Sequence, residues 1–250
     1  MEFEYVPLLE TQRKLCDIPR GSERFEQYIA TLRGDTFDDM AVPLSAFNPM
    51  GKQHVADLLD AYLAMDADSL AASALLGISD ELPTSETRWK IALVLADDAE
   101  GGWTNRYATE FDHRYKGKAN YRRGWTIGML WTSESADEER VRIEVRAALA
   151  RAVHVAAHGH ASTLGEMLDQ SGFVAAIAEV RSQEMDEEEA EYTRQVIQPC
   201  LESESKAVQI ACLFGDSAAD QLGYERFGLC ERAGLRLAAQ QRGEPKWSTT

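Results

Sequence analysis

Several features that identify common classes of protein are missing from this sequence of 250 residues. Its four cysteines are widely spaced and form no C-x-x-C pair, which argues against a zinc ribbon and against a thioredoxin-type redox motif. No wholly apolar run, such as residues 91–96, is longer than six residues, whereas a membrane span needs roughly 20. No apolar segment follows the acidic amino terminus, so no secretory signal is expected. We therefore expect a soluble, cytoplasmic protein with reduced cysteines and no membrane contact.

The motifs of several nucleotide-binding and hydrolytic sites are absent as well. No G-x-G-x-x-G or Walker lysine pattern occurs, and the Gly-Asp-Ser triplet at 215–217 is not part of a G-x-S-x-G nucleophile elbow. The net charge of −16 disfavours binding to nucleic acid, because most of the surface would repel phosphates. With 44% hydrophobic and 27% charged residues, the chain has the composition of a globular protein with a substantial core.

Hydrophobic spacing predicts a mostly helical protein with a small sheet. The helices are expected over residues 22–33, after Asn48 and Pro49, over 67–76 and from about 135 onward. Strands are expected near 89–97, from the unbroken apolar run, and near 124–132, from alternation of bulky and small residues. The connection between the two strands is long enough for a crossover helix, which allows parallel pairing. The predicted fold class is α+β, predominantly helical, with about ten helices and a small central sheet.

We expect one domain over residues 1–250. A change of composition near Pro83 leaves open a helical amino-terminal subdomain at 1–84, followed by an α+β part at 85–241. The last residues, 242–250, are expected to form a loose tail. One domain is preferred because neither an internal repeat nor a low-complexity linker divides the chain.

Residues 101–131 carry the opposite charge from the rest of the chain. This segment holds four more basic than acidic residues, and seven of the 21 aromatic residues. A basic, aromatic segment in an acidic protein is suited to binding a small anionic molecule or an acidic protein surface. Its predicted ligand-binding residues are Trp103, Asn105, Arg106 and Arg114. Four further cations between residues 116 and 123 are expected to lie in a loop that could close over an anion.

The aromatic residues of this segment also have a purely structural interpretation. Four of them recur every four residues and would form one stripe on a helix, namely Trp103, Tyr107, Phe111 and Tyr115. Aromatic stripes at helical spacing usually pack into a core, so burial is the favoured interpretation.

Three carboxylates follow the first predicted strand directly. Asp97, Asp98 and Glu100 precede a pair of glycines, at the type of strand end where ligands gather in open α/β sheets. Adjacent carboxylates can hold a divalent metal such as Mg²⁺ or act as acid and base, so these three residues are the predicted catalytic group. The structural alternative is an ordinary turn, with Thr104 capping the helix that follows.

Three of the five histidines lie within seven residues. His154 and His158 are four residues apart on one face of a predicted helix, and His160 follows Gly159, where the helix is expected to end. Histidines with this spacing can share a metal ion, so these three are the predicted metal ligands. The glutamate of an H-E-x-x-H motif is absent, and histidines near a helix carboxyl terminus also interact favourably with the helix dipole.

Taken together, these residues favour a metal-assisted enzyme or a binding protein for a small anionic ligand. The alternative is a non-catalytic interaction module that docks an acidic partner through residues 101–131. The two hypotheses differ in what they require. The enzyme needs polar groups that converge, whereas the module needs tryptophan and tyrosine side chains exposed on the surface.

Overall fold

The computed structural model describes residues 2–33, 41–76, 78, 88–180 and 184–241. Pro83 and the predicted tail at 242–250 lie outside these residues. The chain divides into two compact units, which are described separately below. The first contains residues 1–106 and 118–152, and the second contains residues 107–117 and 153–250. The division therefore does not fall at residue 84, while the expectation of a single domain stays a prediction.

The first unit is built on a small parallel sheet. Its strands are β1 (Glu2–Tyr5), β2 (Arg88–Ala96) and β3 (Trp125–Trp131), in the order β1-β2-β3. β2 pairs in parallel with both neighbours, and its register with β3 runs from Lys90 opposite Trp125 to Ala96 opposite Trp131. The last six residues of β2 are buried, which explains why this central strand is an unbroken apolar run. The two predicted strands are thus confirmed, and β1 was not predicted.

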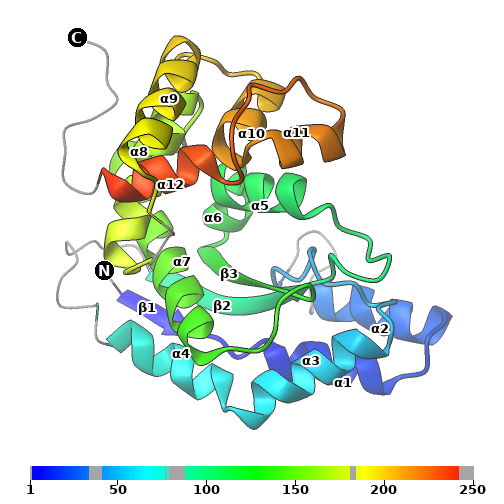
Figure 1. The fold of residues 1–250 in the computed structure, drawn as a ribbon. Helices are drawn as coiled ribbons and strands as arrows, with labels where there is room; N and C mark the ends of the chain where they lie inside the picture. The colour runs from blue at the N-terminus through cyan, green and yellow to red at the C-terminus, as the bar shows by residue number, and fades with distance from the viewer. Residues whose placement is uncertain (1, 34–40, 77, 79–87, 181–183, 242–250) are drawn as a thin grey trace. The chain divides into compact units, whose positions relative to one another are not determined.

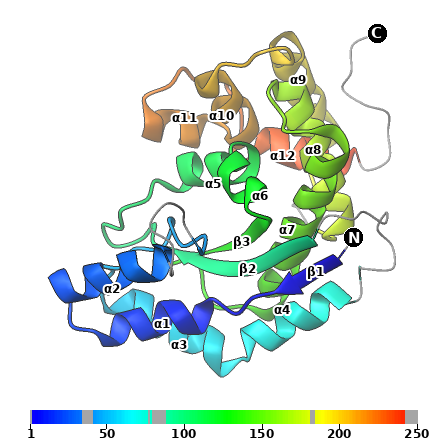
Figure 2. The same ribbon diagram turned by 180° about the vertical axis from the view of Figure 1, so that it is seen from behind.

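Helices cover this sheet. The helices of the first unit are α1 (Leu9–Asp17), α2 (Ser22–Arg33), α3 (Gln53–Ala64), α4 (Ala67–Leu76), α6 (Lys118–Arg122) and the first part of α7 (Glu138–His158). α7 lies in front of the strands in Figure 1 and behind them in Figure 2. The Thr126 hydroxyl donates a hydrogen bond to the Ala148 carbonyl of this helix at 3.0 Å. A Cβ at Gly128 would lie 2.7 Å from the Glu144 carbonyl oxygen, so the close approach of α7 to β3 requires glycine there.

The second unit is helical throughout its described residues. It contains nearly all of α5 (Arg106–Tyr115) and the end of α7, followed by α8 (Leu164–Ile177), α9 (Glu187–Ile197), the 3₁₀ turn η2 (Gln198–Cys200), α10 (Lys206–Phe214), α11 (Asp216–Leu222) and α12 (Ala233–Gln240). Its core gathers apolar side chains from these helices, such as Phe111, Leu168, Phe214 and Leu237. The predicted fold class, α+β and predominantly helical with a small sheet, is confirmed.

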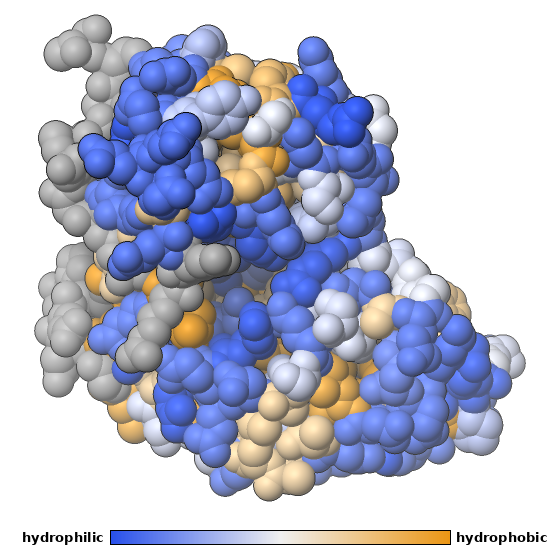
Figure 3. Space-filling model, in the orientation of Figure 1, coloured by the Kyte–Doolittle hydropathy of each residue, from blue (hydrophilic) through white to orange (hydrophobic). Residues whose placement is uncertain are grey.

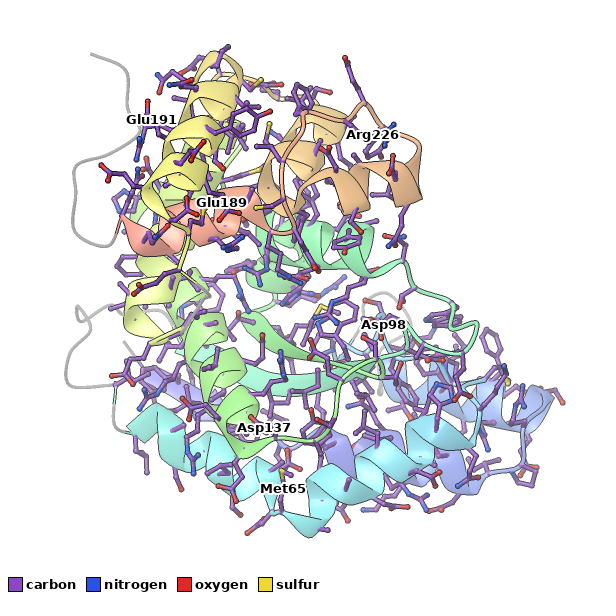
Figure 4. The ribbon with its side chains drawn as sticks, viewed as in Figure 1. Met65, Asp98, Asp137, Glu189, Glu191 and Arg226 are labelled. Atoms are coloured by element: carbon purple, nitrogen blue, oxygen red, sulfur yellow. The ribbon has the colours of Figure 1, made fainter. Side chains whose placement is uncertain are left out.

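Helix starts show where local patterns succeed and fail. The sequence pattern of Thr163 and Glu166 forms a capping box at the start of α8. The same pattern at Ser135 and Glu138 forms none, because α7 begins at Glu138 and Asp137, labelled in Figure 4, accepts a hydrogen bond from the Arg140 amide instead. The loop predicted for the cations between residues 116 and 123 is wrong, since α6 occupies most of that stretch.

The predicted helix start at Asn48 and Pro49 is wrong as well. α3 begins at Gln53, and the Asn48 side chain has a different use. Its carbonyl oxygen accepts a hydrogen bond from the Met50 amide at 3.0 Å, which makes a local turn. Its amide nitrogen donates to the carboxylate of Asp97, the residue that follows β2, as described below.

Within the described part of the chain, no helix is both long and apolar enough to cross a membrane. Figure 3 shows one face of the molecule, on which hydrophilic residues predominate and hydrophobic ones form smaller patches. Both observations agree with the short apolar runs and the high charge content of the sequence.

Candidate functional site at the carboxyl end of the sheet

The predicted carboxylates lie where β2 and β3 end side by side. The ladder extends one step beyond β3, because the Thr132 amide donates a hydrogen bond to the Ala96 carbonyl at 3.0 Å. Asp97 and Asp98 follow immediately, and Figure 4 shows Asp98 just past the arrowheads of these strands. Since the strands are parallel, both bring their carboxyl ends to the same edge, and the polar residues after β3 meet those after β2.

Asp97 is a buried carboxylate held by neutral donors and one histidine. The residue is 2% exposed. One carboxylate oxygen accepts a hydrogen bond from the Asn48 side-chain amide at 2.7 Å. The other is 3.0 Å from the Thr132 hydroxyl and 2.9 Å from His54 Nε2. No lysine or arginine of the described residues pairs with Asp97, so histidine is the only titratable group in contact with this buried charge.

His54 stands between two carboxylates. It belongs to the first turn of α3, and 17% of its side chain is exposed. Because a carboxylate oxygen only accepts, Nε2 is assigned as the donor to Asp97, and the neutral ring then carries its lone pair on Nδ1. Nδ1 is itself buried and has no hydrogen-bond partner, although Glu100 Oε2 is 3.4 Å away. The ring thus has one nitrogen that Asp97 orients and one nitrogen without a hydrogen bond.

The turn after Asp97 depends on two small residues. A Cβ at Gly102 would lie 2.2 Å from the Asp97 carbonyl oxygen, so only glycine allows the chain to fold back this closely. The Thr104 amide and hydroxyl both donate to the same carbonyl, at 3.3 and 2.7 Å. The turn places Glu100 in the left-handed region with φ of +49°, which is unusual for a residue other than glycine.

Asp98 and Arg106 form a network of hydrogen bonds and ion pairs with the residues that follow β3. Asp98 accepts hydrogen bonds from the Ser133 amide at 2.9 Å and from its hydroxyl at 2.7 Å. Arg106 lies 3.6 Å from Asp98, binds Glu134 and covers the Trp131 ring at 4.9 Å. The predicted catalytic carboxylate Asp98 and the predicted anion-binding residue Arg106 are therefore paired with each other. Such a pair is suited to holding the loops of the site in place.

The other predicted ligand-binding residues are divided between the two units. Trp103 precedes α5 and is 50% exposed, and Asn105, next to the helix start, is half-buried. Arg114 belongs to the second unit, where its guanidinium pairs with Glu110.

The aromatic stripe is confirmed as core for its helical members. Tyr107, Phe111 and Tyr115 are buried in the core of the second unit. Trp103 is not part of that stripe, because the helix begins three residues after it.

The predicted metal ligands also lie in the second unit. The His154 and His158 rings are 4.7 Å apart between centroids, and His154 lies against Phe173. Burial, with a smaller contribution from His158, lowers the pKa of His154 to about 4. His160 follows Gly159, where the helix ends as expected. Among the described residues, no three histidine, cysteine or acidic side chains are grouped so that they could hold a metal ion, so a divalent metal stays a prediction.

Sequence patterns could not have found His54 and Asn48. They are separated from Asp97 by 43 and 49 positions, and neither belongs to a motif. The only local signal is that Asn48 lies in the loop before α3 and His54 in the first turn of that helix, near a loop of the kind where functional side chains are common.

Comparisons with protein-family models, with curated proteins and with solved structures each gave no match to this chain. Function is therefore inferred from the chemistry of the site alone, which is the level at which function resides even where a fold is familiar.

Proposed function

We propose that this protein is an enzyme that acts on a small anionic molecule by general acid–base catalysis, with His54 as the proton-transferring group. The observation that carries this proposal is the 2.9 Å contact between His54 Nε2 and the buried carboxylate of Asp97, at the carboxyl end of a parallel strand.

The pairing supplies what a catalytic histidine needs. A carboxylate on one ring nitrogen fixes the tautomer and orientation of the ring and stabilises the imidazolium that forms when the other nitrogen takes a proton. Asp97 is itself fixed by Asn48 and Thr132. The hydroxyl of Thr132 also accepts hydrogen bonds from the amides of residues 98 and 99, so the whole support is rigid before a substrate arrives.

Lys52 is the residue that favours an anionic substrate in this proposal. It lies two residues before His54, it is exposed, and its ammonium group donates to the Glu100 backbone carbonyl at 2.5 Å. No carboxylate of the described residues forms an ion pair with it, in contrast to Arg106 and Arg114. An uncompensated cation beside a catalytic histidine favours substrates that carry a carboxylate or phosphate group.

One observation favours the alternative of an interaction module. Trp103, in the basic segment, is 50% exposed, and exposed tryptophan is common at binding hot spots. The remaining large aromatic residues give no such support, since Trp125 and Trp131 are 5% and 2% exposed. We therefore place the interaction module second.

The free cysteines fit a reducing compartment, so we keep the cytoplasm as the proposed location. Nucleic acid remains an unfavoured partner on the grounds of the net charge of −16.

The test is turnover of a panel of phosphate esters, hydroxy acids, oxo acids and amino acids, followed by proton and phosphorus NMR. At least one compound should be converted, and His54→Gln should slow that conversion by about 10²–10⁴-fold, the usual contribution of a positioned acid or base. The matched control is His113→Gln on α5, a histidine with no part in the proposed site, which should convert the compound at the wild-type rate. Equal turnover in wild type and His54→Gln, or conversion of no compound, would contradict the proposal.

A further inference from the structure

Glu100 occupies a position that an anionic substrate would need. Its carboxylate oxygen is 3.4 Å from His54 Nδ1, the ring nitrogen left available by Asp97. Its backbone carbonyl is 2.5 Å from the ammonium group of Lys52. One residue therefore contacts both groups to which the proposed function assigns the substrate.

The contact between the Glu100 carboxylate and His54 is of a kind that another anion could replace. The Glu100 side chain is 62% exposed, and the pair lacks the geometry of a hydrogen bond. Asp97, in contrast, is fully enclosed and bonded through both oxygens. An exposed carboxylate at this distance contributes little binding energy, so another anion can replace it.

The backbone at Glu100 adopts a conformation that is uncommon for glutamate. Its φ of +49° lies in the left-handed region, which glycine or asparagine adopts at lower cost. Asp66, Glu179 and Arg232 also have a positive φ, so the inference rests on the contacts of Glu100 with His54 and Lys52 and not on its backbone.

We propose that Glu100 is an intramolecular competitor of the substrate. Its carboxylate lies beside His54 Nδ1, and its backbone carbonyl occupies the ammonium group of Lys52, to which the carboxylate or phosphate group of the substrate binds. The inference rests on the proposed function and deepens it: Lys52 binds the anion, and Glu100 sets how strongly a ligand must bind to gain access to His54. We therefore expect an anion that binds through a single group to have a higher Kd than one with a further group that contacts the protein.

The competition makes two predictions of opposite sign. Removing the Glu100 carboxylate should strengthen anion binding, because the ligand no longer displaces it. Removing the Lys52 charge should weaken binding, because Lys52 contacts the same residue as His54 Nδ1 and none of the described carboxylates forms an ion pair with it. A merely structural role for either residue would not produce this opposition.

The experiment is a titration with inorganic phosphate and, separately, with malonate, followed by the backbone amide signals of residues 100–102 in proton–nitrogen NMR spectra. Glu100→Gln should lower the Kd about threefold, and Lys52→Met should raise it about fivefold, as expected for partly exposed charges. Glu100→Gly is the second variant, since it removes the carboxylate and suits the left-handed backbone. It should bind at least as tightly as Glu100→Gln.

The matched controls remove the same charges elsewhere in the first unit. Asp57→Asn on α3 and Lys14→Gln on α1 should leave the Kd within twofold of wild type, which separates a local effect from a change in net charge. Unchanged or weaker binding in both Glu100 variants, or unchanged binding in Lys52→Met, would overturn the proposal. Absence of binding to all variants would overturn it as well.

Failure here is distinguishable from failure of the proposed function. If Glu100 and Lys52 have no effect on anion binding while His54→Gln still abolishes turnover, only the competition is wrong. If anion binding responds as expected while His54→Gln keeps full turnover, the anion site stands and the catalytic role of His54 does not.

Discussion

Two carboxylates of this protein are almost equally buried and differ in what neutralises them. Asp97 in the first unit is 2% exposed, and Glu110 in the second is 4% exposed. Glu110 is bound by two guanidinium groups, with Arg232 at 3.0 and 2.7 Å and Arg114 on the same helix. Asp97 is bound by an amide, a hydroxyl and an imidazole.

The difference in binding partners indicates a structural role for Glu110 and a chemical role for Asp97. Arginine is a permanently charged donor, so the Glu110 cluster serves to join helices. An imidazole, in contrast, can accept or donate a proton during a reaction, so the Asp97 cluster contains a group that is suited to acid–base chemistry. Burial of a carboxylate is therefore weak evidence of function, whereas burial against a titratable partner is stronger evidence.

The largest effect is expected at Asp97. Asp97→Asn should slow turnover by about 10²–10⁴-fold while the protein still folds, because an amide fills the same space but cannot stabilise an imidazolium or enforce the Nε2–H tautomer, and its NH2 group must face one of the donors that Asp97 accepts from. The measurement is turnover of the compound identified above, with circular dichroism to verify the fold. Wild-type turnover in this variant would remove the distinction between the two carboxylates.

Glu110→Gln should lower the stability of the protein and leave the rate of turnover of the folded protein unchanged. Breaking a buried pair leaves Arg114 and Arg232 without their charge partner, at a cost of about 3 kcal/mol in the free energy of unfolding. Urea denaturation measures this loss. The neighbouring exposed residue Asp112, paired with Lys206, provides the control, since Asp112→Asn should cost under about 0.5 kcal/mol. Equal losses for both variants would show that burial does not decide the cost.

The smallest effect concerns His154, a histidine without a carboxylate. Burial and His158 lower its pKa to about 4, from 6.5 in the unfolded chain. The unfolded state therefore binds more protons between these values, and stability falls as the pH drops from 6.5 towards 4. After discounting for partial exposure, the loss due to His154 is about 1 kcal/mol. Over this pH range, the free energy of unfolding of His154→Gln should therefore fall by about 1 kcal/mol less than that of the wild type. Denaturation at several pH values measures the difference. An identical pH dependence in both proteins would contradict this.

The sequence predicted the parts of this picture that depend on local pattern. The apolar run before Asp97 indicated a buried strand, and its end located the carboxylates. The role of Arg106 could not be predicted, because it depends on Ser133 and Glu134, which only strand pairing brings close. β1 was missed because four residues with partly exposed side chains give too short a pattern. His54 was missed because its partner lies on a different element far along the chain.

The tautomer of His54 decides whether the site works as proposed. Long-range proton–nitrogen NMR spectra of the uniformly labelled protein distinguish the two ring nitrogens, and the signals missing from His54→Gln identify this residue. We predict a proton on Nε2 that is lost or shifted strongly in Asp97→Asn, with Nδ1 unprotonated in the neutral ring. A neutral ring protonated on Nδ1, or a His54 signal unaffected by Asp97→Asn, would contradict the assignment of His54 as a base oriented by Asp97.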